Sequence, residues 1–405
     1  MAVNTIGQNL KTFEKALKEN YLPVWQNQLG VEPSPLLSKI KKVPLNGNKI
    51  VASAPVGLSG GFGFGEEGKA TPAAGGVRFE RFESYAKDMY VNVVISAKAV
   101  RLTGSSGAMA NALDTEVKGA YNTAKWNVGR SLFGNGTGVL TTIKAAGSSA
   151  DTKTVKVDDT KNLKEGLIID IYSGTPTPGK LDATPETGGA GVRILAVDRV
   201  NKTILVSGTP ATPKDGFITV QNSYNREITG LGAIFDDTIP TIYGITKKDN
   251  HFLKPITVDC QGDIGDGIIT GALRTARNDK NSNINMLLCG DKAYDHYVEY
   301  LRTNNTRIED TSFEITGGFK AIKFLFGNNE VALVNESFIP DKEMWGVDTG
   351  SLELHSQEWE FADLQGGGIF NLMEGQSVYR ALLANYGDLI CTNPGGCVRL
   401  TNAAA

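Results

Sequence analysis

The chain has 405 residues and a mass of 43.3 kDa, which at roughly 150 residues per domain corresponds to two or three domains. Its 41 basic and 44 acidic residues give a formal charge of -3, which argues against a protein devoted to nucleic-acid binding. No apolar run approaches the ~20 residues that cross a bilayer, and the start carries no basic or apolar leader. We therefore expect a soluble, folded protein, made in a cytoplasm, whose four cysteines are reduced.

The first part of the chain is expected to form a helix followed by an extended arm. Leu10, Phe13, Leu17 and Tyr21 are three and four residues apart, which predicts a short helix within residues 7–25. Prolines then keep the chain extended, and no acidic residue occurs between Glu32 and Glu66. The lysines of this stretch are Lys39, Lys41, Lys42 and Lys49. They face either a polyanion such as packaged DNA or simply solvent.

A glycine-rich segment follows and predicts a long hairpin with a flexible tip. Residues 57–76 contain eight glycines, which rules out a helix or a regular strand interior. We expect Lys49 to Ala54 to form one strand and the alternating run from Met89 to Ala99 to form the returning strand. A two-stranded ribbon is marginal in water on its own, so its contacts are expected on another molecule.

The remaining elements indicate an α+β fold with an insertion. Residues 107–133 show one apolar stripe at helical spacing, which predicts a helix about 40 Å long. Residues 139–222 contain short strands separated by turns, which predict a small inserted all-β module. Helices are expected near residues 264–276 and 294–301, with strands near 284–289, 321–326, 331–334 and 352–354. A mixed segment extends from Met373 to Leu400.

No motif in the sequence meets the chemical requirements of a catalytic, cofactor-binding or metal site. The segment Gly63-Phe-Gly-Glu-Glu-Gly68-Lys69-Ala70 resembles a phosphate loop, but Ala70 replaces the hydroxyl that holds magnesium and no helix can begin at Thr71-Pro72. The three histidines do not pair with each other or with cysteine at a metal-ligand spacing. Cys289 lacks the flanking glycines of a nucleophile turn. We therefore expect no enzyme activity.

The order of elements resembles the major capsid protein of tailed bacteriophages, the shell fold named after bacteriophage Hong Kong 97. These elements are an extended arm, a glycine-tipped hairpin, one very long helix, a β insertion and a final α+β region. Local segments support the resemblance: Trp25-Gln-Asn-Gln-Leu-Gly30, Pro33-Ser-Pro-Leu-Leu37, Ala54-Pro-Val-Gly57, Asn127-Val-Gly-Arg-Ser-Leu-Phe-Gly134, Arg226-Glu-Ile-Thr-Gly-Leu231 and Glu374-Gly-Gln-Ser-Val-Tyr-Arg380. The resemblance covers nearly the whole chain.

The resemblance implies a division of the chain and a structural role. It makes residues 1–45 an N-arm, 46–100 an E-loop, 101–138 the spine-helix region, 139–225 the insertion, 226–385 the axial and peripheral α+β domain and 386–405 a C-terminal segment. The expected assembly contacts are Phe62, Phe64, Glu66, Glu67 and Lys69 at the E-loop tip, and Leu10, Phe13, Leu17, Trp25, Lys39, Lys41 and Lys42 in the N-arm.

The implied partners are copies of the same chain in hexamers and pentamers, packaged double-stranded DNA bound non-specifically, portal and decoration proteins, and a separate scaffolding protein. No cofactor and no membrane is expected, and the location is the virion, assembled in a bacterial cytoplasm. A covalent link between Lys69 and Asn393 of neighbouring subunits is a further possibility. The alternatives are a cellular encapsulin-like nanocompartment shell, a β-rich phage tail or fibre protein, and an enzyme with its site within residues 230–385.

Overall fold

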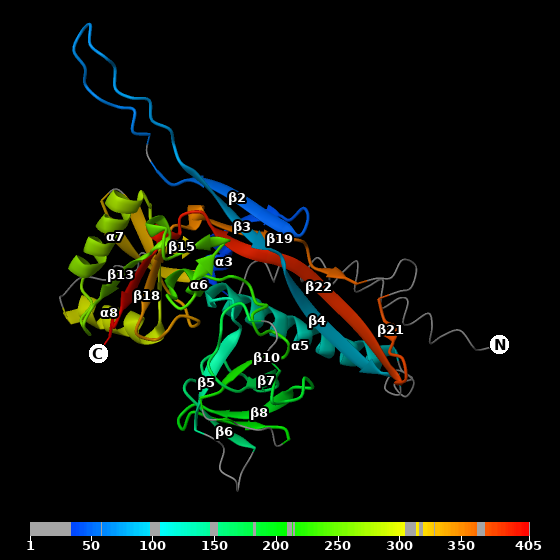
Figure 1. Ribbon diagram of the computed structural model, residues 1–405. Coiled ribbons are helices and arrows are strands. Elements are labelled where there is room, and N and C mark those ends of the chain that lie inside the picture. The colour runs from blue at the N-terminus through cyan, green and yellow to red at the C-terminus, as the bar shows by residue number, and fades with distance from the viewer. Residues whose placement is uncertain are drawn as a thin grey trace. The chain divides into compact units, whose positions relative to one another are not determined.

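The computed structural model describes residues 34–57, 59–97, 106–145, 153–180, 184–208, 213, 215–303, 313–315, 319–327, 329–362 and 369–404 (Figure 1). The chain divides into two compact units. The first consists of Met1–Ser38, Lys87–Gly230 and Ser356–Gly387, and the second of Lys39–Ala86, Leu231–His355 and Asp388–Ala405. No helix in the described ranges is both long and apolar enough to cross a membrane.

The first unit is built on a long helix that packs against a sheet. Helix α5 spans Ser106–Phe133, which confirms the helix expected over residues 107–133. Strand β4 (Lys87–Ser96) pairs antiparallel with β22 (Val378–Cys391), and the short strands β20 (Glu360–Phe361) and β21 (Asn371–Leu372) also pair with β22. Helix α5 lies along this sheet (Figure 1) and buries Val117, Tyr121 and Ala124 against it.

The predicted β insertion is a closed six-stranded barrel within the first unit. Its strands follow the order β10-β5-β6-β9-β8-β7 and then return to β10. Their bounds are β5 Val139–Ala145, β6 Thr154–Val157, β7 Ile168–Tyr172, β8 Val192–Asp198, β9 Thr203–Val206 and β10 Phe217–Val220. Alternate side chains point inward, so the barrel has its own apolar core. Strand β5 was not expected from the sequence.

The two ends of the barrel meet beside the C-terminal end of α5. Thr219 of β10 lies opposite Val139 of β5, and the backbone N–H of Asn225 donates to the carbonyl of Thr137 at 2.8 Å. The Arg130 guanidinium binds both carboxylate oxygens of Glu227, at 2.5 and 3.0 Å, and both side chains are buried. The barrel is therefore inserted at a closed, ion-paired base, as an insertion requires.

The second unit contains a seven-stranded mixed sheet covered by two helices. Its order is β13-β23-β18-β14-β17-β16-β15, in which β13 with β23 and β14 with β17 are parallel. Helices α7 (Asp266–Lys280) and α8 (Asp291–Thr303) share one apolar core with alternate residues of these strands. The strands are β13 Ile256–Asp259, β14 Met286–Cys289, β15 Phe313–Ile315, β16 Phe319–Phe326, β17 Asn329–Asn335, β18 Met344–Val347 and β23 Val398–Thr401.

Short elements complete the described chain. Strand β1 (Lys41–Pro44) pairs with β19 (Leu352–Ser356). The hairpin is formed by β2 (Lys49–Pro55) and β3 (Phe79–Tyr85). The others are α3 Pro35–Lys39, α6 Gly232–Phe235, β11 Thr241–Ile242, β12 Ile245–Thr246, and the 3-10 turns η2 His251–Leu253, η3 Thr349–Ser351 and η4 Pro394–Gly396.

The hairpin exists, but its returning strand is not the one expected. Lys49 pairs with Tyr85 and Pro55 with Phe79, so β3 is the partner of β2. The alternating run that begins at Met89 instead forms β4, where Met89, Val91, Val93 and Ile95 face the core beneath α5. The expected pairing is therefore wrong, although the alternation in that run correctly indicated a strand with one buried face.

Candidate assembly surfaces

The stem of the hairpin is fixed firmly within the second unit. Ile50 and Phe82 are buried on its inner face, and Phe82 has no exposed surface. The Phe82 ring makes edge-to-face contacts with Tyr243 and Phe252, with ring centroids 6.1 and 6.4 Å apart. The backbone N–H of Glu83 also donates to the carbonyl of Tyr243 at 2.9 Å. These contacts hold the base of the hairpin in place.

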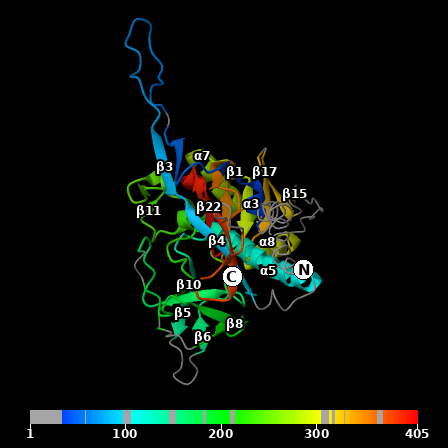
Figure 2. The same cartoon turned by 90° about the vertical axis from the view of Figure 1, so that its right-hand side faces the viewer.

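Beyond the stem, the hairpin continues as an extended ribbon that projects away from it (Figures 1 and 2). The backbone N–H of Val56 donates to the carbonyl of Arg78 at 2.9 Å, and every described residue from Ser59 to Phe79 is exposed. The two sides approach closely at Gly61 and Gly75. A Cβ on Gly75 would lie 2.4 Å from the backbone nitrogen of Gly60, so a side chain there would force the sides apart.

The tip of this ribbon carries two exposed aromatic rings and three charges. Phe62 is 82% exposed and Phe64 is 96% exposed, and their ring centroids are 5.4 Å apart in an edge-to-face arrangement. Glu66 forms an ion pair with Lys69, and Glu67 is exposed beside them. All five residues expected at the tip therefore lie together on one exposed loop. Exposed apolar groups that are rimmed by polar ones are typical of interaction sites.

The phosphate-loop-like segment lies in this same ribbon. Residues 70–78 form no helix. Both nucleotide-binding motifs need a helix N-terminus directly after the glycines to bind the phosphates. The glycines of this segment shape the tip of the hairpin instead.

The basic stretch before the hairpin is partly neutralised by carboxylates from distant parts of the sequence. Lys41 contacts Glu353 at 2.6 Å, and Lys49 contacts Glu83 at 2.6 Å. The hydrogen bond from Lys41 is the main cause of the lowered pKa of Glu353, and a bond to His355 adds to it. These pairs reduce the charge that the arm presents to a polyanion.

The other residues expected in the N-arm have different outcomes. Lys39 ends helix α3, and Lys42 lies in β1 with an exposed side chain. Leu10, Phe13, Leu17 and Trp25 lie outside the described residues, so their expected contacts stay predictions.

Cys289, the thiol weighed as a nucleophile, is fully buried. Burial raises the pKa of the Cys289 thiol well above its ordinary value, which disfavours the reactive thiolate. All four cysteines are buried and free of disulfides. In the described part of the chain, no cluster of three or more histidine, cysteine or carboxylate groups could hold a metal ion.

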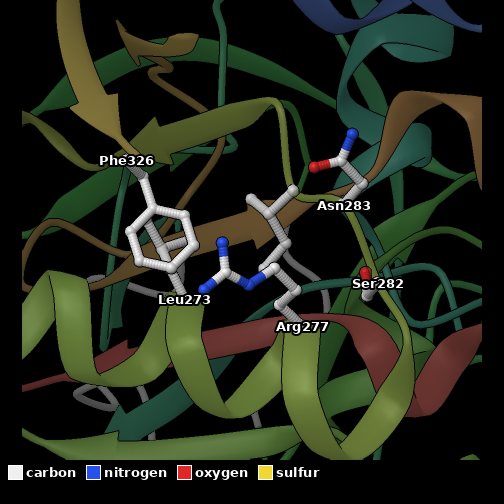
Figure 3. Close-up of a pocket in the computed structure, with 6 residues that line it drawn as sticks. Leu273, Arg277, Ser282, Asn283 and Phe326 are labelled. Carbon is white, nitrogen blue, oxygen red and sulfur yellow. The ribbon is translucent and has the colours of Figure 1, made fainter. Parts of the chain in front are cut away.

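A shallow crevice with no room for a water molecule lies at the end of α7 (Figure 3). The Arg277 guanidinium lies over the Phe326 ring at 4.8 Å from its centroid and closes one side. The crevice is lined by Leu273, Arg277, Ser282, Asn283, Ile284 and Phe326. None of these residues is a histidine, carboxylate or thiol, so the Ser282 hydroxyl has no base among them.

Two further exposed apolar surfaces were not among the assembly contacts expected from the sequence. One is the outer wall of the barrel, where Leu195 and Leu205 are exposed. The other is the open face of the β4 and β22 sheet, where Tyr90 and Val94 are exposed. Apolar residues at the outward positions of an alternating strand were the available signal.

Comparison with known proteins identifies the fold. No family model matches the sequence, and no curated protein matches it. The chain is similar to a subunit of the cyanophage A-1(L) capsid, with a TM-score of 0.53 at 10% identity over 91% of this chain and 92% of that chain. It also matches the capsid of a native GTA particle, with a TM-score of 0.45 at 10% identity over 93% and 92% of the two chains.

A third match is the holo-SrpI encapsulin complex from Synechococcus elongatus PCC 7942, with a TM-score of 0.43 at 8% identity over 92% and 88% of the two chains. The identification of the fold rests on the cyanophage match alone. The chain has the fold of a phage capsid subunit, and the expected Hong Kong 97-type α+β fold is confirmed.

Proposed function

We propose that this chain is the major capsid protein of a tailed double-stranded DNA bacteriophage, and that its copies form the icosahedral head that encloses the genome. The observation that carries the proposal is the projecting ribbon, because its two phenylalanines are 82% and 96% exposed in the single chain. The similarity of fold to a cyanophage capsid subunit supports it.

The energetics of the tip favour assembly over a solitary subunit. Burying a phenylalanine side chain contributes about 1.5–3 kcal/mol, so burying Phe62 and Phe64 on a neighbour contributes about 3–6 kcal/mol per hairpin. A closed shell repeats such a contact in every subunit, so modest contacts together hold a stable particle. The stem, fixed through Phe82, keeps the direction of the ribbon defined.

The other segments take the roles that the fold suggests. Residues 1–45 are the N-arm, 101–138 the spine-helix region, 139–225 the insertion, 226–385 the axial and peripheral domain and 386–405 the C-terminal segment. Residues 46–100 are the E-loop segment, of which the hairpin ends at Tyr85 and β4 joins the sheet of the first unit. The chain works without catalysis, in the virion, after assembly in the bacterial cytoplasm. Portal, decoration and scaffolding proteins and packaged DNA are its further partners.

Electron microscopy of the expressed chain tests the proposal. The wild type is expected to form closed icosahedral shells, alone or with a scaffolding protein from the same genome. Deleting residues 57–68 is expected to leave a folded subunit that melts cooperatively but no longer assembles. Shells from the deletion variant would contradict the role of the hairpin, and a wild type that stays monomeric with every such partner would contradict the proposal itself.

The same experiment separates the alternatives. Rods or trimers would indicate a tail or fibre protein. Shells that enclose a specific enzyme instead of double-stranded DNA would indicate a nanocompartment, and such a gene would lie beside an enzyme gene instead of portal and packaging-motor genes.

A further inference from the structure

The outer wall of the barrel carries an apolar patch that its own fold does not use. Ile194 and Ile204 point into the barrel, so their neighbours Leu195 and Leu205 point outward, with 50% and 37% of their surface exposed. Leu205 of β9 lies between Thr154 of β6 and Ala196 of β8 in the register. A barrel stabilised by its interior gains nothing from these outward leucines.

This patch has a positive rim. Arg193 of β8 is exposed two residues before Leu195, and Lys156 is exposed on β6, the strand that pairs with β9. Asp198 lies at the end of β8, but its carboxylate accepts hydrogen bonds from the backbone N–H groups of Val200 and Asn201 at 2.9 and 3.0 Å. These bonds, that from Asn201 above all, lower the pKa of the Asp198 carboxyl and keep it charged, so Lys156, Arg193 and Asp198 together sum to a formal charge of +1.

The tip of the hairpin has the opposite character. Phe62 and Phe64 supply exposed apolar surface, and beside them Glu66, Glu67 and Lys69 sum to a formal charge of -1. The Glu66 carboxylate is paired with Lys69, which leaves Glu67 as the uncompensated charge of the tip. Apolar surface meets apolar surface and an acidic rim meets a basic one.

We infer that the hairpin tip of one copy docks on the outer barrel wall of a second copy, with Phe62 and Phe64 against Leu195 and Leu205 and with Glu67 facing Arg193. The inference rests on the proposed assembly function and names the surface that receives the tip. The insertion then acts as a clamp that each subunit offers to a neighbour's hairpin.

The other open apolar face fits the tip less well. Tyr90 and Val94 on β4 are exposed, but the cation on that face, Arg380, donates to the Asn92 side chain at 2.8 Å. Asp88 lies on the same side of β4, so this face has no positive excess. An acidic tip therefore gains electrostatic attraction on the barrel and none on the sheet.

A charge exchange tests the pairing. Glu67→Lys alone and Arg193→Glu alone each place like charges together, and each is expected to raise the subunit concentration needed for assembly about tenfold. The variant that carries both exchanges restores the attraction and is expected to assemble close to the wild-type concentration. If the double variant needs a subunit concentration raised by the product of the two single-variant factors, the two charges do not interact and the inference is overturned.

A matched control comes from the same barrel. Lys180 is exposed, and its hydrogen bonds use backbone atoms: its N–H donates to the Thr177 carbonyl at 3.4 Å and its carbonyl accepts from the Asn225 side chain at 2.7 Å. Lys180→Glu makes the same change of charge away from the wall and is expected to leave assembly unchanged. Thermal unfolding of each isolated variant subunit confirms that a loss of assembly is not a loss of folding.

Cysteine cross-linking locates the contact directly. The native cysteines are buried, so Glu67→Cys with Leu195→Cys introduces the reactive pair, and mild oxidation of assembled particles is expected to give chains linked in a ladder. Glu67→Cys with Tyr90→Cys is the comparison. A ladder from the Tyr90 pair and none from the Leu195 pair would overturn the inference while leaving the proposed function intact, and a wild type that never assembles would refute the proposed function.

Discussion

Replacing both tip phenylalanines separates folding from assembly. In Phe62→Ala/Phe64→Ala the two rings that are removed contact mainly each other and solvent, since their exposed fractions are 82% and 96%. Surface substitutions of this kind change stability by no more than about 0.5 kcal/mol. The free energy of unfolding of the subunit is therefore expected to stay at the wild-type value.

Assembly is expected to respond very differently. If both rings are buried on a neighbour, their removal costs about 3–6 kcal/mol per hairpin contact. At 1.4 kcal/mol per tenfold change, the subunit concentration needed for assembly rises by a factor of about 10² to 10⁴. Urea unfolding of the isolated subunit and light scattering over a range of subunit concentrations measure the two quantities separately.

Phe82→Ala is the matched control, because it removes the same side chain from the same hairpin. Phe82 is fully buried against Tyr243 and Phe252, so its loss is expected to destabilise the subunit by about 3–5 kcal/mol. Particles that form from the double tip variant at the wild-type concentration would refute the reasoning. So would a tip variant that unfolds as readily as Phe82→Ala, because the rings would then stabilise the subunit itself.

Three other predictions concern the base of the barrel and the arm. Arg130→Met is expected to lower stability by about 3–5 kcal/mol in urea unfolding because it strands the buried Glu227 carboxylate, and Glu227→Leu added to it should recover much of the loss. Gly230→Ala places a Cβ 2.4 to 2.6 Å from three carbonyl oxygens at the end of α5, so a loss of about 1–3 kcal/mol or more is expected, and a wild-type melting temperature would contradict this. Lys41→Met is expected to cost up to about 1 kcal/mol at pH 7. Because the folded-state pKa of Glu353 is lowered, that difference should disappear as the pH falls below the carboxyl's ordinary value of 4.5, and a difference that persists in acid would contradict the pairing.

The long helix and the inserted module were predictable because their signals are local. In α5, Val117, Tyr121 and Ala124 are three and four residues apart, and all three are buried on one face. In the barrel, alternation of inward and outward residues occurs within each short strand, as in Ile204 buried beside Leu205 exposed. Periodicity of this kind is visible in a window of a few residues.

The returning strand of the hairpin could not be predicted because its pattern is misleading. In β3 the apolar residues are Phe79, Phe82 and Tyr85, which are spaced by three residues as on a helix and not by two as on a strand. Only Phe82 is buried, and the other two are exposed. The run that begins at Met89 alternates between apolar and polar residues, so it was predicted to be the returning strand in place of β3.

Long-range pairing explains the other gap. The basic stretch appeared uncompensated because no acidic residue is nearby in sequence, yet Lys41 contacts Glu353, which is 312 positions away. A window along the sequence cannot detect such a pair. The charge of a segment in isolation therefore overstates the field that it presents once the chain is folded.

The glycines of the ribbon have different structural roles that their number alone does not reveal. Their number suggested only flexibility, but a Cβ on Gly61 would lie 2.8 Å from the backbone nitrogen of Gly75, whereas a Cβ on Gly65 would meet nothing within 4 Å. Gly61 and Gly75 are needed for the two sides to approach, while Gly65 is free to turn. Because Gly61 directly precedes Phe62, the close approach fixes the point from which the aromatic tip is presented. Beyond this point an added Cβ on Gly65 or Gly68 would meet nothing within 4 Å, so the end of the ribbon keeps the freedom that adaptation to a neighbouring surface requires.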